Sequence, residues 1–255
     1  MDGLHQHGAV SLWKEQNDIE NVLGSRIALS QGPGQFWTLG DFPDFPPARV
    51  AQALARLHAE GRLRRYGRGL YYEPMMTIIG EAPPPAFEIA RKLAKGDRLI
   101  LASISAYNRL GLTTQIPARP VVATRRNLGT DQVEVIIRDL DRYGEATDEA
   151  LMVLDALGHI NTIPDCPPKK AIERLCLLLK TRYLAGVTPD ELACLAMKDR
   201  PGVRGMVGLL GDMVGGLSET WRQRLQASLN PLTKFKINRL DDIVPLELRR
   251  EWHFV

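Results

Sequence analysis

The segment 35–74 constrains the fold of this chain more than any other, because signals for helix starts, helix ends and turns follow one another closely within it. Thr38 and Asp41 have the spacing of a capping box, with Asp in the usual place of Glu, and predict a short helix that Pro43 ends. Asp44 is placed to cap the next helix, where a negative charge suits the helix dipole. Two prolines then fall in the first turn of that helix, where a missing N–H costs little: Pro46 and Pro47.

The longer helix, predicted over 48–60, has two different faces. A buried stripe at i, i+4, i+7 is formed by Val50, Leu54 and Leu57. A polar face at i, i+3, i+7 is formed by Arg49, Gln52 and Arg56. Guanidinium and amide groups are those that recognise guanine and adenine edges in a DNA major groove. The alanines at 51, 53 and 55 would keep the helix slim enough to approach the bases.

A β-hairpin is predicted directly after this helix. Gly61 suits the left-handed position that ends a helix, and 62–66 and 69–73 read as strands. Gly67 and Arg68 between them fit a two-residue type II′ turn, which places Arg68 at the tip. Short helix, turn, longer helix and hairpin is the order of a winged helix-turn-helix, a device that places one helix in a DNA major groove.

Charge in this region supports the same interpretation. From Arg49 to Leu70 the sequence has six arginines and a single acidic residue, Glu60. The expected DNA contacts are Arg49, Gln52 and Arg56 on the helix and Arg64, Arg65 and Arg68 on the hairpin. Two other interpretations stay open, because an arginine-rich helix face is often only solvated, and winged helices also serve as protein-docking modules.

The whole chain is not a polycation. It has 255 residues, a net charge of +3, 44% hydrophobic and 25% charged residues, which are ordinary values for a globular protein. The basic region is therefore local, as a defined docking face requires. No apolar run approaches a membrane span, and the first residues lack the order of a signal peptide. Three cysteines without paired spacing (166, 176 and 194) favour a reducing, cytoplasmic location, and we expect Cys176 and Cys194 to be buried.

The chain as a whole is predicted to be α+β, with an N-terminal winged helix-turn-helix, a mixed α/β second domain and a helical C-terminal region. The expected divisions are 1–74 for the DNA-binding domain, 75–86 for a stiff, extended linker, 87–165 for the second domain and 166–255 for the helical extension. A further helix over 11–29, interrupted near Gly24, is expected to pack behind the DNA-binding helices, before a break at 31–34.

The second domain is predicted from short signals. Ser103 is expected to cap a helix over 104–110, and 145–158 reads as an amphipathic helix. Strands are expected at 99–102, 119–124 and 132–137, and a further helix at 87–95. The helices of the last third are expected at 169–183, 189–198, 204–217 and 219–228, with the leucines at 175, 177, 178 and 179 in the core. The order of the segments after Asn230 stays open.

Two segments carry a family resemblance. VAQALARLHAEGRLRRYGRGLYYEP (50–74), with FWTLGDF (36–42) before it, resembles the winged-helix segment of the AbiEi-like antitoxins of type IV toxin–antitoxin systems. SISAYNRLGLTTQIPARPVVAT (103–124) is similar to a later segment of the same family, and the two occur in the family's order. The resemblance covers about residues 10–180.

The resemblance implies a transcriptional repressor that binds an inverted-repeat operator in double-stranded DNA upstream of its own toxin–antitoxin operon. It also implies a second domain that supports cooperative or homodimeric binding, and a functional partner, a toxin with a nucleotidyltransferase-like fold, whose direct contact stays open. The matched helix and wing carry the six contact residues named above. Arg125 and Arg126 are a weaker candidate for a second DNA-facing patch, and a solvated loop is an equal alternative.

Motifs of catalysis were sought in the sequence as well. A nucleotidyltransferase needs Gly-Ser followed by Asp-x-Asp; Gly24-Ser25 precedes Asp41 and Asp44 at the wrong spacing, whereas Asp139 and Asp141 lack the Gly-Ser. The sequence has no phosphate-binding glycine loop, serine nucleophile elbow or zinc-protease motif. We therefore expect no enzyme, metal site or cofactor. The alternatives kept are a winged-helix regulator with an effector site and a protein-interaction module with a partner bound by the C-terminal region.

Overall fold

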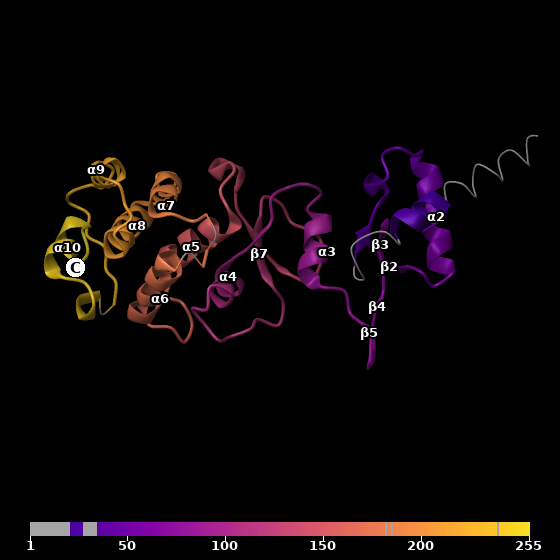
Figure 1. Ribbon diagram of the computed structural model, residues 1–255, viewed down its shortest axis with the longest axis horizontal. Helices are drawn as coiled ribbons and strands as arrows, with labels where there is room; N and C mark the ends of the chain where they lie inside the picture. The colour runs from indigo at the N-terminus through magenta and orange to yellow at the C-terminus, as the bar shows by residue number, and fades with distance from the viewer. Residues whose placement is uncertain (1–20, 28–34, 182, 185, 239) are drawn as a thin grey trace, which may run out of the picture. The chain divides into compact units, whose positions relative to one another are not determined.

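A computed structural model describes residues 21–27, 35–181, 183–184, 186–238 and 240–255 (Figure 1). The protein is α+β and divides into two compact units, Met1–Lys92 and Leu93–Val255. Each unit has a separate cluster of buried hydrophobic residues. Among these described residues, none of the helices has the length and apolar composition of a membrane span. The predicted break at 31–34, and the predicted helix before residue 21, lie outside the described residues.

The first unit contains a small antiparallel sheet and short helices. Residues 21–27 are helical and continue through Gly24. The other elements are β1 (Phe36–Trp37), the 3-10 helix η1 (Leu39–Asp41), α2 (Pro47–Ala59), β2 (Arg64–Gly67), β3 (Leu70–Tyr72), β4 (Met75–Thr77) and β5 (Gly80–Ala82). The strand order β1-β3-β2 places β3 in the centre, with Phe36 opposite Tyr72 and Arg65 opposite Tyr71. The strand β1 was not predicted.

The start of the first short helix is as predicted, but that of α2 is not. The backbone N–H and the hydroxyl of Thr38 donate to Asp41 Oδ2 at 2.7 and 2.9 Å, which confirms their pairing at the start of η1. Asp44 does not cap α2. The helix begins only at Pro47, with Pro46 at the N-cap, and Arg26 donates to Asp44 Oδ2 at 3.0 Å. The Asp44 carboxylate, which its sequence position had predicted to cap the helix, instead pairs with Arg26, 18 residues earlier in the chain.

The end of α2 matches the sequence. Gly61 has φ of +78° and its N–H donates to the carbonyl of His58, while Arg62 N–H donates to the carbonyl of Leu57. Both are bonds of a Schellman motif, which satisfies carbonyls that a helix end leaves without partners. The chain is thereby turned directly into β2.

The hairpin β2–β3 forms where predicted but with another turn. Gly67 pairs with Leu70, so the two loop residues are Arg68 and Gly69, and the register shifts between Arg65 and Gly67. The positive φ, +72°, is at Gly69 and not at Gly67, which excludes the predicted type II′ turn. Glycine at the second loop position takes the left-handed conformation, and Arg68 still stands at the tip.

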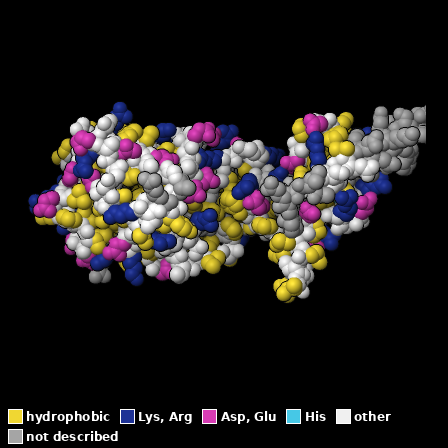
Figure 2. All heavy atoms as spheres, viewed as in Figure 1, with side chains coloured by type: hydrophobic (Ala, Val, Ile, Leu, Met, Phe, Trp, Pro, Cys, Tyr) yellow, Lys and Arg dark blue, Asp and Glu magenta, His cyan; other side chains and the backbone are white. Residues whose placement is uncertain are grey.

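The predicted linker is in part a second hairpin. β4 and β5 pair antiparallel, with Met75 opposite Ala82, and the compact units divide only after Lys92. Glu81 holds this hairpin to the sheet, because its carboxylate accepts from Arg64 Nε at 3.1 Å and from the Tyr72 hydroxyl at 3.2 Å. The turn exposes Ile78 and Ile79 almost completely. Figure 2 shows hydrophobic side chains at the end of this hairpin.

The core of the first unit confirms the predicted stripe of α2. Val50, Leu54 and Leu57 are buried together with Leu23 and Ile27, so the described part of the first helix packs behind α2 as expected. The remaining buried members are Phe42, Ala53, Leu63 and Tyr71. The prediction for Ala53 was wrong, because its side chain belongs to this core and does not face outward like its neighbours at 51 and 55.

The second unit begins with a three-stranded sheet. α3 (Ala86–Leu93) spans the boundary between the units, and the next elements are β6 (Ile100–Leu101), α4 (Ser103–Arg109), β7 (Val121–Thr124), β8 (Glu134–Ile137) and η2 (Asp141–Tyr143). The order is β6-β7-β8, with β6 antiparallel and β8 parallel to β7. Ser103 does not cap α4. It is the first helical residue, with φ of +50°, and its N–H donates to Asp155 Oδ2 at 2.8 Å.

Helices make up the rest of the second unit. They are α5 (Asp148–Gly158), α6 (Pro168–Lys180), α7 (Pro189–Ala196), α8 (Pro201–Val214), α9 (Glu219–Ala227), η3 (Leu240–Asp242) and α10 (Leu246–Glu251). α5 was expected to be amphipathic, yet every residue from Ala150 to Leu157 is buried, because α4, α7 and α8 all contact it. One hydrophobic core extends from Ile100 to Phe254, so the predicted division at 165/166 runs through a single packed body.

Two details of the helical region differ from the prediction. Cys176 is buried as expected, whereas Cys194 is exposed. Leu177 is also exposed, unlike Leu175 and Leu178, because it falls on the outer face of α6. An apolar residue on a helix does not by itself report burial.

The end of the chain, whose order was left open, is packed into the second unit. Trp252 is fully buried, and its indole Nε1 donates to Asp212 Oδ2 at 2.8 Å. Phe235 and Phe254 form an isolated parallel β-bridge through their backbones, and the centroids of their rings lie 5.6 Å apart. The last residues therefore belong to the same hydrophobic core as α8.

Candidate nucleic-acid interface

The predicted contact face of α2 is solvent-accessible. Gln52 and Arg56 are exposed and Arg49 is half-buried, on the side of the helix away from the buried stripe. Arg56 Nε lies 3.3 Å from Glu60 Oε1, one turn further along the helix, and both side chains are about half exposed. An exposed pair of this kind is weak, so Arg56 can exchange the carboxylate for another acceptor at little cost.

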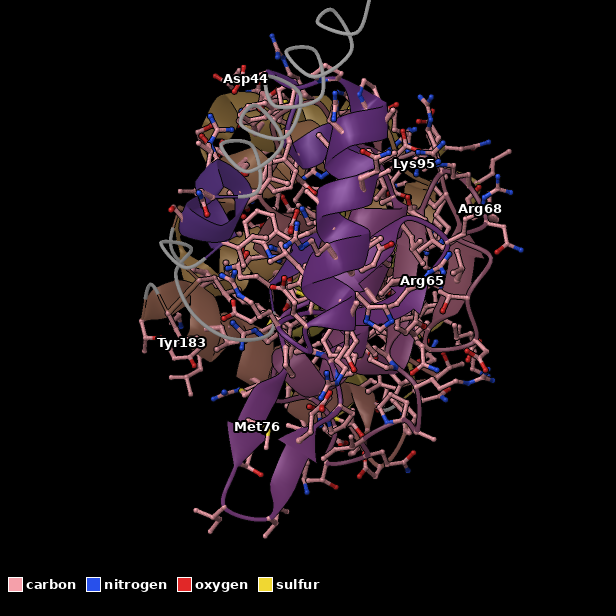
Figure 3. The ribbon with its side chains drawn as sticks, turned by 90° about the vertical axis from the view of Figure 1, so that its right-hand side faces the viewer. Asp44, Arg65, Arg68, Met76, Lys95 and Tyr183 are labelled. Atoms are coloured by element: carbon pink, nitrogen blue, oxygen red, sulfur yellow. The ribbon has the colours of Figure 1, made fainter. Side chains whose placement is uncertain are left out.

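The hairpin beside α2 carries two further exposed arginines. Arg65 is exposed, and its Nε donates to the carbonyl of Gly67 at 3.2 Å, which orients the side chain along the strand. Arg68 is exposed at the turn. Figure 3 views α2 with Arg65 and Arg68 on the same flank of the helix. Because hydrogen-bonded strands form the hairpin, the two guanidinium groups are held on a fixed frame beside α2.

Arg64 is held differently from its neighbours. Its Nη1 donates to the carbonyl of Gly61 at 3.2 Å, in addition to the ion pair with Glu81. These contacts link the end of α2 to the second hairpin through one side chain. The structure thus gives Arg64 a positioning role within the unit, which sequence reasoning missed because Glu81 lies 17 residues away along the chain.

The second predicted patch is largely neutralised by carboxylates. Arg125 lies 2.9 Å from Asp141 and 3.5 Å from Asp97, and Arg126 lies 2.7 Å from Asp97. The hydrogen bond that Arg125 donates to the Asp141 carboxylate, followed by the charge of Asp97, raises the pKa of the Arg125 guanidinium above its ordinary value. The guanidinium groups of this loop already have anionic partners within the unit, unlike a face open to phosphates.

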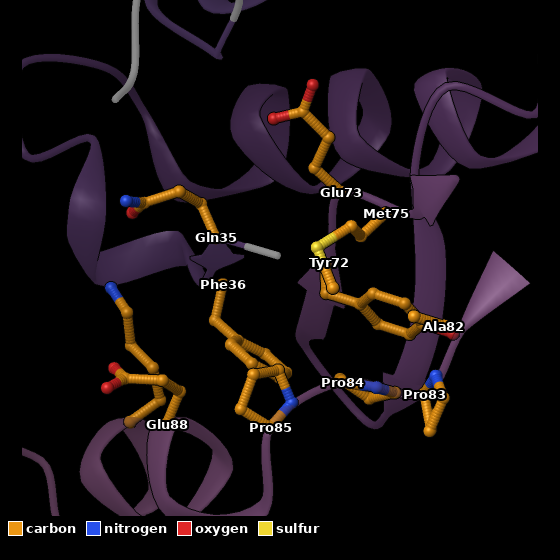
Figure 4. A pocket seen from close by; sticks show the side chains of 11 residues that line it. Gln35, Phe36, Tyr72, Glu73, Met75, Ala82, Pro83, Pro84, Pro85 and Glu88 are labelled. Carbon is orange, nitrogen blue, oxygen red and sulfur yellow. The ribbon is translucent and has the colours of Figure 1, made fainter. Parts of the chain in front are cut away.

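The first unit also contains a small, mainly apolar cavity of about 200 Å³ (Figure 4). Phe36, Tyr72 and Met75 form one side, and three consecutive prolines, 83–85, form the other. Lys92 and Glu88 line its polar end, and Lys92 Nζ is held at 2.7 Å from Asp41. The cavity is built from the base of the hairpins and carries no convergent set of reactive groups.

A polar cavity of about 250 Å³ lies in the second unit, and sequence reasoning found no sign of it. Its charged lining residues are Arg138, Arg142, Asp155, His159, Asp199 and Arg200. They come from five different elements or connections spread over more than 60 positions, so no local motif marks them. Tyr143 lies beside them and its pKa is raised to about 12, first by burial and then by its hydrogen bond to Asp199.

Among residues with described positions, no group of three or more His, Cys, Asp or Glu side chains is arranged to hold a metal ion. The three cysteines are free thiols. The exposed arginines of the first unit and the polar cavity of the second are thus the two sites with defined chemistry.

Comparison with known proteins finds a similarity to one family model over part of the chain, and no activity. Residues 29–154 match a family described as a family of unknown function, DUF6088. No curated protein matches the chain. A solved structure, that of the RV2827C protein from Mycobacterium tuberculosis, is similar at a TM-score of 0.43 and 16% identity, over 82% of this chain and 81% of that one. So low a TM-score does not establish a shared fold.

Proposed function

We propose that the protein is an antitoxin-type transcriptional repressor whose first unit is a winged helix-turn-helix bound to operator DNA. The observation that carries the proposal is the face of α2 opposite its buried stripe, which bears Arg49, Gln52 and Arg56. Helix α2 takes the part of the recognition helix and the β2–β3 hairpin that of the wing. Both elements lie in one compact unit and are joined by the Schellman turn at Gly61.

The side chains then have separate tasks. Arg56 and Gln52 contact base edges in the major groove, where guanidinium and amide groups discriminate between bases. Arg68, at the hairpin tip, contacts phosphates or a narrow minor groove, and Arg65 contacts phosphates. Arg64 supports the wing from behind. A homodimer places two such units on an inverted repeat whose half-sites are about one helical turn of DNA apart.

The antitoxin role rests on the resemblance to AbiEi-like proteins at 36–42, 50–74 and 103–124. The protein would repress its own operon in the cytoplasm and oppose a toxin with a nucleotidyltransferase-like fold encoded beside it. It would act through binding alone, without catalysis or a cofactor. The family that matches residues 29–154 has no assigned function, so the match itself does not support the antitoxin role.

DNA binding is tested on the full chain by fluorescence anisotropy, with duplexes from the region upstream of its gene and shuffled duplexes of equal composition. If the two protomers together neutralise about four phosphates, through Arg65 and Arg68 of each, affinity should fall roughly a hundredfold between about 50 and 200 mM salt. The upstream duplex should also bind at least about a thousandfold more tightly than the shuffled one. A salt-independent affinity, or equal affinity for both duplexes, would contradict operator binding and favour protein docking.

The antitoxin role has a separate test. The chain is expressed together with the neighbouring toxin-type gene, and growth is compared with that of cells expressing the toxin alone. Restored growth supports the role. Growth arrest in both cultures, with operator binding intact, would leave a repressor that is not an antitoxin.

A further inference from the structure

The polar cavity of the second unit is formed where α5 ends. Arg138 follows β8, Arg142 lies in η2, and Arg200 lies between α7 and α8, so three guanidinium groups from distant segments line one hollow. His159, directly after α5, adds an imidazole to the same lining. Clusters of arginine around a recess are unfavourable through mutual repulsion unless anions balance them.

The anions within the chain balance the cluster only in part. Asp155 is almost fully buried and accepts from Arg138 Nη2 at 2.9 Å and from the Ser103 N–H at 2.8 Å. Asp199 accepts from the Tyr143 hydroxyl at 2.7 Å and lies 3.8 Å from Arg142. Two carboxylates therefore face three guanidinium groups, which leaves an excess of one positive charge before His159 is considered.

The arginines that line the hollow also keep N–H donors beyond those used in the contacts within the chain. Arg138 meets Asp155 through Nη2, and Arg200 contacts the Gly158 carbonyl at the end of α5 through its own Nη2. A guanidinium carries five N–H donors in a planar fork, so one such contact occupies a minority of them. Arg142 lies 4.6 Å over the Tyr143 ring, which fixes its plane. Arginines fixed by their own partners are suited to bind a second anion without further ordering.

We propose that this cavity binds a small phosphate monoester. The phosphate lies among Arg138, Arg142 and Arg200, in the bidentate geometry that guanidinium forks offer to phosphate oxygens. A volume of about 250 Å³ exceeds that of a bare phosphate and leaves room for a small organic group. Leu151, Leu154 and Val203 also line the hollow. The site does not depend on the proposed DNA binding.

Isothermal titration calorimetry of the full chain at low salt tests the site with glucose 6-phosphate, inorganic phosphate and glucose as probes. We expect glucose 6-phosphate to bind, inorganic phosphate to bind more weakly and glucose to give no signal. Arg142→Gln and Arg200→Gln should each weaken binding of glucose 6-phosphate at least about tenfold, because each removes a charge-assisted hydrogen bond. The control Arg119→Gln removes an exposed arginine of the same unit outside the cavity and should leave binding unchanged.

Circular dichroism and the unfolding temperature without ligand show whether each variant is folded. If Arg200→Gln does not fold, binding of glucose 6-phosphate to Arg142→Gln alone tests the proposed site. Absence of binding to the unaltered chain would overturn the proposal. So would an equal loss in Arg119→Gln, because binding would then report only overall charge. Weakened binding of duplex DNA in Arg142→Gln, with no binding of glucose 6-phosphate, would overturn it and assign these arginines to DNA.

Discussion

Three arginines close together in the sequence are placed in three different environments. The Arg64 side chain donates hydrogen bonds to the Gly61 carbonyl and to Glu81. Arg65 donates to the Gly67 carbonyl, and Arg68 is exposed at a turn. Arginine therefore stabilises the hairpin at one position and is accessible to a binding partner at another. The difference lies in which acceptors the fold brings near each side chain.

Replacement of Arg56 and of Arg68 by alanine should change DNA binding in different ways. Arg56→Ala should cost about 1–3 kcal/mol of operator binding and relax preference at one base position, because that side chain is assigned to a base edge. Arg68→Ala should weaken all duplexes similarly and lower the salt slope by about one. Anisotropy titrations against single-base variants of the operator measure both effects.

The matched control is Arg91→Ala, which removes one exposed arginine from α3 in a pair with Glu88. It should leave both the affinity and the base preference as they are. If Arg56→Ala keeps the base preference of the unaltered chain, α2 does not recognise bases through this residue.

At the scale of elements, α8 shows how a glycine fixes the packing of a distant segment. A Cβ at position 208 would overlap the six-membered ring of Trp252, so the indole lies directly against the helix backbone. Its Nε1 then reaches Asp212, one turn further along α8, and Arg222 pairs with the same carboxylate. The C-terminal segment is thus joined to α8 by close contact and by a satisfied polar group.

Gly208→Ala should destabilise the second unit by about 1–3 kcal/mol, the cost of overpacking, although alanine favours helices over glycine. Gly202→Ala on the same helix is the control, since its Cβ would meet Phe235 at 3.5 Å, an ordinary contact distance. Urea unfolding followed by far-ultraviolet circular dichroism and by intrinsic tryptophan fluorescence, to which Trp221 and Trp252 of the second unit contribute, measures both. Equal stability of the two variants would show that the close contact with Trp252 is not required.

The described residues of the whole molecule form two separate hydrophobic cores, one in each compact unit, and we expect the two units to unfold separately. Leu54 lies in one core and Leu175 in the other, and both are fully buried. Helix α3 contributes residues on either side of the division, so the boundary lies within a helix and not in a loop.

Calorimetry of the full chain should therefore show two unfolding transitions. Leu54→Ala and Leu175→Ala should each lower one of them, with a loss of about 2–5 kcal/mol in the unit affected. Leu175→Ala should keep its DNA affinity at temperatures where the second unit is folded. A single transition that both variants lower equally would show that the two cores unfold as one body.

The sequence by itself determined the features that depend on near neighbours. The box of Thr38 and Asp41, the buried stripe of α2, the turn at Gly61 and the arginine at the hairpin tip each rest on residues a few positions apart. Their energies come from local backbone geometry and helical period, which short sequence patterns reflect. The caps predicted at Asp44 and Ser103 were wrong, because distant partners take those groups instead. The helices α6 to α9 were located for the same reason, with ends shifted by a few residues.

Tertiary structure alone decided which distant groups meet. It paired Asp44 with Arg26 and Arg64 with Glu81, and it placed Trp252 against Gly208. It also gathered the arginines of the polar cavity from segments that share no motif. Charges and buried surfaces pair with whatever the packing brings within reach, and that depends on the whole chain.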